Sequence, residues 1–216
     1  MKITRVKGII VSERAYKESS KLLNIITHEY GVIGVIAKGA KRLNSKFYNS
    51  TSKLIYADFQ INYKENGLST LISSDIINFY ENIKKDLKCV SYAAFICELS
   101  LQVRKQNNNE KILDLLIASL DKINEGFDPI VVTNILELKY LSFLGITPNL
   151  NSCTLCSSEK ILRMLYYVDI SKISKIDLSD SVKREVDEFL SEYYDKYTGL
   201  YLKSKKLLSS LNNICV

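Results

Sequence analysis

The spacing of apolar residues changes once along this chain, near Asn78, and this change constrains the fold more than any other feature of the sequence. Before it, apolar and polar residues alternate, most clearly between residues 54 and 63. After it, apolar residues recur every three or four positions, as between residues 92 and 103. Side chains alternate between the two faces of a strand, whereas a helix repeats about every 3.6 residues. The pattern therefore predicts a strand-rich domain at residues 1–78 and a helical domain at residues 79–216.

The first domain divides into five short apolar segments separated by turn residues. They span residues 2–11, 22–27, 32–37, 54–63 and 68–72. Gly8 predicts a bulge or bend, and Gly31 and Asn66-Gly67 predict tight turns. The longest gap, residues 38–53, lies between the third and fourth segments. This layout is typical of an OB-fold β-barrel, although a five-stranded SH3-like barrel has a similar pattern. The expected fold class is α+β, an OB-fold barrel followed by an all-helical domain.

The helical domain contains recognisable helix ends. Asn107 and Gly126 follow the first two apolar helical patterns. Asp128-Pro129 predicts an N-cap with proline in the first turn, and Gly145 predicts the end of that helix. Another helix is expected from Ser179, and a short final one over residues 201–211. Residues 147–176 show no clean period.

Residues used in catalysis are scarce in this chain. His28 is the single histidine, and its place beside a turn predicts an exposed side chain. The glycines at 31, 34 and 39 are spaced for turns, and no Gly-Lys-Ser or Gly-Lys-Thr sequence follows them. A binding protein without enzymatic activity and without a cofactor is therefore expected.

The sequence also indicates a compartment. No apolar run approaches the roughly 20 residues of a membrane span. The first seven residues interleave charged and apolar side chains, which is a strand pattern and not that of a signal peptide. Five cysteines, an odd number, argue against a secreted disulfide framework. A cytoplasmic protein is expected.

Positive charge is concentrated at the N-terminal end. Residues 1–52 hold ten Lys/Arg and three acids, a net charge of +7, whereas the whole chain carries +6. The other 164 residues therefore sum to −1. Such asymmetry favours a polyanionic partner at this end of the chain.

The segment from Ala37 to Phe47 is the best candidate for phosphate contacts. It follows a strand-like run and holds four cations, a turn glycine and no acid. Small residues let a backbone approach closely, while cations neutralise a polyanion. The predicted contacts to nucleic acid are Lys38, Lys41, Arg42 and Lys46, assisted by Arg14 and Lys21. Tyr16, Phe47 and Tyr48 lie among these cations, but rings in small barrels are often part of the core.

The end of the helical domain is predicted to bind a protein partner. Residues 202–208 combine three lysines, Lys203, Lys205 and Lys206, with three leucines, Leu202, Leu207 and Leu208. A mixed basic and apolar surface suits an acidic peptide that ends in apolar residues. The alternative is that the leucines belong to the core.

Cys153 and Cys156 have the spacing of half a structural zinc site, which needs four ligands. Cys89 and Cys97 fall in apolar helical patterns, and Cys215 is terminal. We therefore predict that the chain folds without zinc, and that Leu162, Leu165, Tyr166 and Val168 pack residues 147–176.

Several segments together resemble the RecO family of bacterial recombination mediators. They are the run from Gly8 to Leu22, residues 27–31, residues 37–42, the spacing of Gly145, Pro148, Cys153 and Cys156, and residues 202–208. The resemblance implies an OB-fold followed by a helical domain, and binding and annealing of single-stranded DNA. It also implies partnership with RecR and with the tail of single-strand binding protein, so that RecA is loaded at gaps and breaks.

One departure from the family is visible. Zinc-binding members carry a second Cys-x-x-Cys about twenty residues after the first, and here residues 163–175 contain neither cysteine nor histidine. Residues 147–176 are therefore interpreted as the trimmed remnant of a zinc-binding insertion.

Two other functions fit the same residues. One is an RNA- or ribosome-associated OB-fold protein, because backbone neutralisation is common to DNA and RNA. The other is a protein-interaction scaffold whose barrel binds a peptide. Annealing of complementary DNA strands would discriminate the mediator from both.

Overall fold

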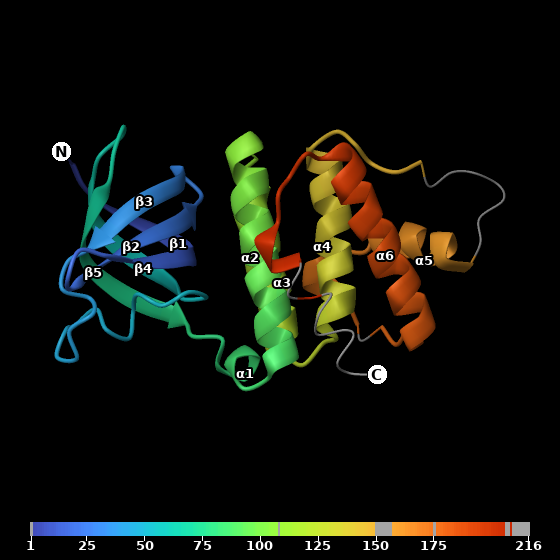
Figure 1. The fold of residues 1–216 in the computed structure, drawn as a ribbon, viewed down its shortest axis with the longest axis horizontal. Helices are drawn as coiled ribbons and strands as arrows, with labels where there is room; N and C mark the ends of the chain where they lie inside the picture. Colours follow the sequence, from blue (N-terminus) through green and yellow to red (C-terminus); the bar gives the residue numbers. More distant parts are fainter. Residues whose placement is uncertain (1, 108, 150–156, 175, 206–207, 209–216) are drawn as a thin grey trace. The chain divides into compact units, whose positions relative to one another are not determined.

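The computed structural model describes residues 2–107, 109–149, 157–174, 176–205 and 208 (Figure 1). The chain divides into two compact units. The first consists of Met1–Glu81 and Cys97–Leu113, and the second of Asn82–Ile96 and Asp114–Val216. A strand-rich part is followed by helices, which confirms the predicted α+β class.

The first unit is built on a closed five-stranded barrel. Its strands are β1 Lys2–Tyr16, β2 Ser20–Thr27, β3 Gly31–Ala37, β4 Tyr56–Tyr63 and β5 Ser69–Asn78. They follow the order β1-β2-β3-β5-β4, β4 pairs back onto β1, and β3 and β5 are parallel. This is the topology of an OB-fold, so the SH3-like alternative is wrong.

Strand β1 closes the barrel because it is long enough to pair twice. Its first half pairs with β4 and its second half with β2, and both pairings are antiparallel. The register shifts between Ile10 and Ser12, so the predicted irregularity at Gly8 is wrong. Gly8 pairs regularly, and a Cβ there would lie 2.5 Å from the carbonyl oxygen of Ile26. The strands therefore need a glycine for close approach and not for a bulge.

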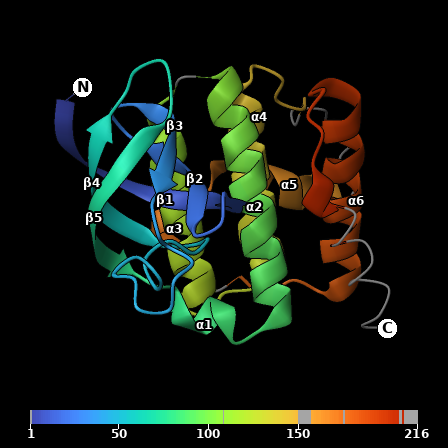
Figure 2. The same cartoon turned by 60° about the vertical axis from the view of Figure 1, so that its left-hand side comes forward.

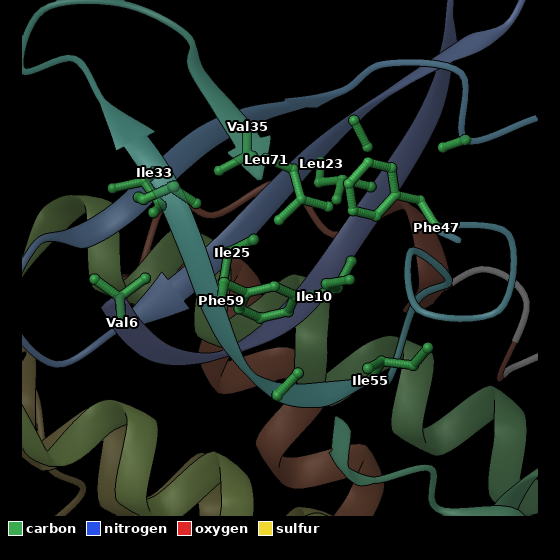
Figure 3. Close-up of a cluster of buried hydrophobic side chains, with 14 residues drawn as sticks. Val6, Ile10, Leu23, Ile25, Ile33, Val35, Phe47, Ile55, Phe59 and Leu71 are labelled. Carbon is green, nitrogen blue, oxygen red and sulfur yellow. The ribbon is translucent and has the colours of Figure 1, made fainter. Parts of the chain in front are cut away.

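The barrel core is made from alternate residues of all five strands and from the loop between β3 and β4 (Figure 3). Phe47 of this loop points into the cluster that contains Leu23 and Leu71. Its members are Val6, Ile10, Leu23, Ile25, Ile33, Val35, Ala37, Ala40, Phe47, Ile55, Ala57, Phe59, Ile61 and Leu71.

The helical residues of the first unit hold a turn of the barrel. Arg104 is buried and donates to the carbonyl oxygen of His28 at 3.4 Å. Its guanidinium also lies 3.5 Å from the place where a Cβ on Gly31 would be. Burial lowers the pKa of Arg104, and Glu110 partly opposes this effect. A charge contributed from helix α2, Leu87–Gln106, therefore fixes the β2–β3 turn.

The helices are α1 Glu81–Lys84, α2 Leu87–Gln106, α3 Lys111–Asn124, α4 Pro129–Phe143, α5 Ser157–Tyr167 and α6 Asp180–Tyr197, with a 3₁₀ turn at Ile170–Lys172. Helices α4, α5 and α6 of the second unit pack on one another (Figure 2). Asp128 caps α4 by accepting from the Ile130 backbone N–H at 2.9 Å, and Gly145 follows its end with φ of +74°. Both predicted helix ends are confirmed.

Among the described residues, no helix is both long and apolar enough to span a membrane.

The structure corrects one detail of the helical prediction and covers part of another. Residues 147–176 contain helix α5, whose Leu162 and Leu165 are buried, although the sequence shows no clean period there. Of the predicted final helix, residues 201–205 and 208 are described; residues 203–205 and 208 are helical, whereas 201 and 202 are not.

Candidate nucleic-acid interface

Two connections meet at one end of the barrel, the β1–β2 turn and residues 38–55 between β3 and β4, which we call the basic loop. The Lys41 backbone N–H donates to Ser19 O at 2.9 Å, and the Gly39 N–H donates to Ser20 Oγ at 3.4 Å. Gly39 has φ of +72°, a conformation that glycine adopts without steric cost. The start of the basic loop is therefore fixed against the neighbouring turn.

The basic loop is also held by its own hydrogen bonds and by the core. Successive turns join Arg42 N to Gly39 O, Ser45 N to Arg42 O and Tyr48 N to Ser45 O, each at 3.0 Å. Phe47 is only 7% exposed, and its carbonyl oxygen accepts from Thr51 Oγ1 at 2.7 Å. A loop pinned in this way presents its surface side chains in a defined arrangement.

Three of the predicted cations, Lys38, Lys41 and Arg42, are exposed on this loop. No aspartate or glutamate occurs between residues 38 and 57. Lys46 is exposed as well, but its Nζ donates to Ile72 O at 2.8 Å and lies 4.9 Å from the centre of the Phe47 ring. The loop therefore combines a rigid backbone with an uncompensated positive surface, which suits contact with phosphates.

The two assisting cations lie at the same end of the barrel but differ in surroundings. Arg14 is exposed on β1, opposite Leu22 of β2. Lys21 forms an ion pair with Glu13 at 2.9 Å and donates to Thr51 O at 3.4 Å. Lys21 thus connects β2 to the basic loop, and its charge is compensated by Glu13.

The aromatic residues near the cations separate into core and surface. Phe47 belongs to the core, whereas Tyr48 is exposed. Lys17 was missed as a candidate. It is exposed in the β1–β2 turn beside the basic loop, with φ of +54° and its Nζ 5.6 Å from the centre of the Tyr16 ring. A signal was available, since Lys17 lies in the short link between two predicted strands.

The predicted partner surface at the C-terminal end is only partly described. Lys203 is exposed, and Lys205 donates to Asp195 Oδ1 at 2.7 Å and to Ser191 O at 2.8 Å. Leu202 and Leu208 are buried, so they do not supply the apolar part of that surface. Lys206 and Leu207 lie outside the described residues.

The described thiols and the histidine show no catalytic arrangement. Burial is the main reason why the pKa of the Cys89 thiol is raised to about 11, and a hydrogen bond to Asp86 adds to the shift. Burial raises the pKa of the Cys97 thiol to about 12. His28 is half-buried, so the prediction that it is exposed is wrong. Cys153 and Cys156 lie outside the described residues. Across the part of the chain that is described, no three His, Cys, Asp or Glu side chains gather as a metal site would require.

The fold and the basic loop together define a class of protein. Its members have an OB-fold barrel with a cationic loop between β3 and β4, followed by a helical unit. The family model described as "Recombination protein O N terminal" matches residues 1–80, and "Recombination protein O C terminal" matches residues 84–160 and 158–206. The chain belongs to the recombination protein O (RecO) family.

Curated relatives support this assignment over nearly the full length. The chain is 30% identical to the DNA repair protein RecO of Bacillus subtilis, over 98% of this chain and 96% of the relative. It is 31% identical to the DNA repair protein RecO of Exiguobacterium sibiricum, over 98% of both chains. The DNA repair protein RecO of Listeria monocytogenes is 28% identical over 96% of this chain and 94% of its own.

Proposed function

We propose that this protein is a recombinational DNA repair mediator. It binds single-stranded DNA, anneals complementary strands and, with RecR, helps to load RecA onto DNA covered by single-strand binding protein. It acts at the nucleoid, without enzymatic activity of its own. Membership of the RecO family over almost the whole chain is the observation that carries the proposal.

The charge distribution supports a DNA contact at the barrel. Lys38, Lys41 and Arg42 are exposed on a loop whose backbone is held by hydrogen bonds, and no acid lies within that loop. Lys46 and Arg14 extend the same positive end, while Lys21 positions the loop through Thr51. We assign DNA binding to residues 1–78 and partner binding to residues 79–216.

Annealing is the most direct test of the function. Complementary strands coated with single-strand binding protein are mixed with and without this protein, and duplex formation is followed by fluorescence. We expect the protein to accelerate duplex formation. Equal rates with and without it would contradict the proposal, and preferential action on RNA strands would favour an RNA-associated role.

The salt dependence of binding tests the phosphate contacts. Lys41→Glu with Arg42→Glu should weaken binding to single-stranded DNA and leave the fold intact, because both side chains are exposed. Each lost phosphate contact flattens the slope of log affinity against log salt by about 0.7 for a single strand, so the double variant should lose about 1.4.

A charge-matched control comes from the second unit. Lys160 and Arg163 are exposed on helix α5, and their reversal to Glu changes the net charge by the same amount. This control should keep the wild-type salt slope. A Lys41/Arg42 variant with an unchanged slope would remove the basic loop from the interface.

The partner contact has a separate test. A labelled peptide with the sequence of the tail of single-strand binding protein is titrated into wild-type protein and into a variant with Lys203 and Lys206 reversed to Glu. We expect weaker binding by the variant, because an acidic peptide loses its counter-charges. Equal affinities would place the peptide on another surface.

A further inference from the structure

An aromatic pair lies at the barrel end opposite the basic loop. The ring centroids of Tyr30 and Tyr63 are 4.3 Å apart, with a tilt of 35° between the ring planes. Both rings are half-buried and pack against the barrel core. Together with Lys2, Lys64 and Glu65 they line an open hollow of about 530 Å³. The proposed phosphate contacts at the basic loop do not use this hollow.

The turn that carries Tyr30 is held in place by three contacts. Thr27 Oγ1 donates to Gly31 O at 3.1 Å and accepts from the Tyr30 backbone N–H at 3.2 Å. Arg104 donates to His28 O in the same turn. Gly31 has φ of +63°, which permits the tight reversal. The Tyr30 ring is therefore placed by the fold.

Tyr63 is fixed from the other side. It pairs with Lys2 across β1 and β4, and the next residue, Lys64, donates its backbone N–H to Ser69 Oγ at 3.2 Å. The pairing places the backbones of Lys2 and Tyr63 side by side, and Lys64 begins the β4–β5 turn. Two cations thus flank a preformed aromatic platform.

We propose that Tyr30 and Tyr63 form a base-stacking site for single-stranded nucleic acid, with Lys2 and Lys64 beside the adjoining phosphates. The inference rests on the proposed function and adds a second contact region to it. Aromatic platforms flanked by cations suit single strands because every base has a π-face. Glu65 lines the hollow, and Glu29 is exposed in the β2–β3 turn beside Tyr30, so stacking and not net charge supplies most of the attraction.

The two contact regions are separated by the length of one strand. Strand β2 has 8 residues and connects the two ends of the barrel, so its first and last residues are roughly 23 Å apart at a rise of about 3.3 Å from each residue to the next. OB-folds cover roughly 4 to 16 nucleotides, so an oligonucleotide near the upper end of this range is the suitable probe.

The test compares ring-removing with ring-keeping variants. Tyr30→Leu with Tyr63→Leu keeps apolar contact with the core, whereas Tyr30→Phe with Tyr63→Phe also keeps the rings. Binding of an oligothymidylate of roughly 16 nucleotides should weaken about 5- to 150-fold for each stacked base in the Leu variant, and the Phe variant should bind as wild type. The salt slope should stay unchanged in both variants, because no phosphate contact is removed.

Two further measurements keep the result interpretable. Tyr167→Leu removes a tyrosine that is 68% exposed on helix α5 and should bind as wild type. A 5-iodouracil oligonucleotide of the same length, irradiated with wild-type protein, should crosslink to Tyr30 or Tyr63. Wild-type affinity in a folded Leu variant, with crosslinks absent from both tyrosines, would overturn the inference.

If the Leu variant fails to fold, the two lysines that line the hollow can be changed instead. Lys2→Glu with Lys64→Glu changes two exposed side chains and should weaken binding and flatten the salt slope by about 1.4. Unchanged affinity and slope would overturn the inference.

If the Lys41/Arg42 variant loses binding while the Leu variant keeps it, only this inference fails. A wild-type protein that binds no single strand would contradict the proposed function as well.

Discussion

Phe47 shows how a single residue gives the basic loop its shape. Its sequence neighbours are cations and polar residues, yet its ring lies in the barrel core with Leu23 and Leu71. Burial of a phenylalanine side chain contributes on the order of 1.5–3 kcal/mol, which is enough to hold a polar loop against the barrel. Lys46 then lies over the outer side of this ring and reaches Ile72 O. The cationic surface is therefore positioned by an apolar contact.

The close approach of the strands at Gly8 leads to a prediction about stability, also at the scale of a single residue. Gly8→Ala should lower the free energy of unfolding by about 1–3 kcal/mol, because the new Cβ would lie 2.5 Å from Ile26 O and 2.7 Å from Ile25 Cγ2. Gly67→Ala is the matched control, since the closest atoms there belong to the flexible end of the Lys64 side chain, at 3.0 Å. Urea unfolding of both variants measures the difference. Equal stability would show that β1 and β2 can separate at no cost.

Helices α4 and α6 enclose acidic side chains. Glu137 of α4 is buried, and Asp187 of α6 is half-buried. Burial raises the pKa of Glu137 well above its usual value, Asp187 raises it further, and Lys205 opposes the shift. Burial also raises the pKa of Asp187, and again Lys205 opposes it. The hydroxyl of Tyr194 donates to the Glu137 backbone oxygen at 2.8 Å and joins the two helices.

This arrangement predicts how stability depends on pH. An acid with a raised folded pKa binds more protons when folded, so its stabilising effect is complete below the unfolded pKa, near 4.5, and is lost as the pH rises towards the folded pKa. The free energy of unfolding should therefore fall as the pH rises above about 4.5, by up to about 1.4 kcal/mol per pH unit for one proton.

Glu137→Gln tests the assignment of this effect. The variant should be more stable than wild type at neutral pH and should show a smaller decline, with the remainder due to Asp187. Urea unfolding at several pH values between 5 and 8 measures both. A decline as steep in the variant as in wild type would mean that Glu137 is not the group responsible.

At the scale of the whole molecule, the compact units do not follow chain order. Residues 97–113 belong with the barrel although they come from helices α2 and α3. Arg104 reaches the β2–β3 turn across 76 residues of sequence. The helical segment is thus part of what holds the β2–β3 turn, which carries Tyr30.

Metal content provides a prediction for the whole chain. A complete zinc site needs four ligands, and Cys153 and Cys156 offer two. Protein purified without chelator should contain far less than one zinc per chain by elemental analysis, and its thermal midpoint should not change on addition of EDTA. Stoichiometric zinc, or a large loss of thermal stability with EDTA, would show that two further ligands exist.

The sequence by itself determined the class of fold, the strand-to-helix order and the chief helix ends. Alternation in residues 54–63, the Asp128-Pro129 cap and Gly145 act through local backbone geometry, which is encoded within a few residues. The cationic loop was visible for the same reason, because net charge needs no partner to be counted.

Tertiary structure alone decided which of these residues are available to a ligand. Pairing across strands, not local sequence, placed Lys21 against Glu13 and put the register shift after Ile10. Core packing buries Phe47, Leu202 and Leu208, so their side chains are not available at the surface. The meeting of Tyr30 and Tyr63 joins residues 33 positions apart, and such contacts arise only when the barrel closes. Burial and pairing depend on residues distant in sequence, and no local pattern records them.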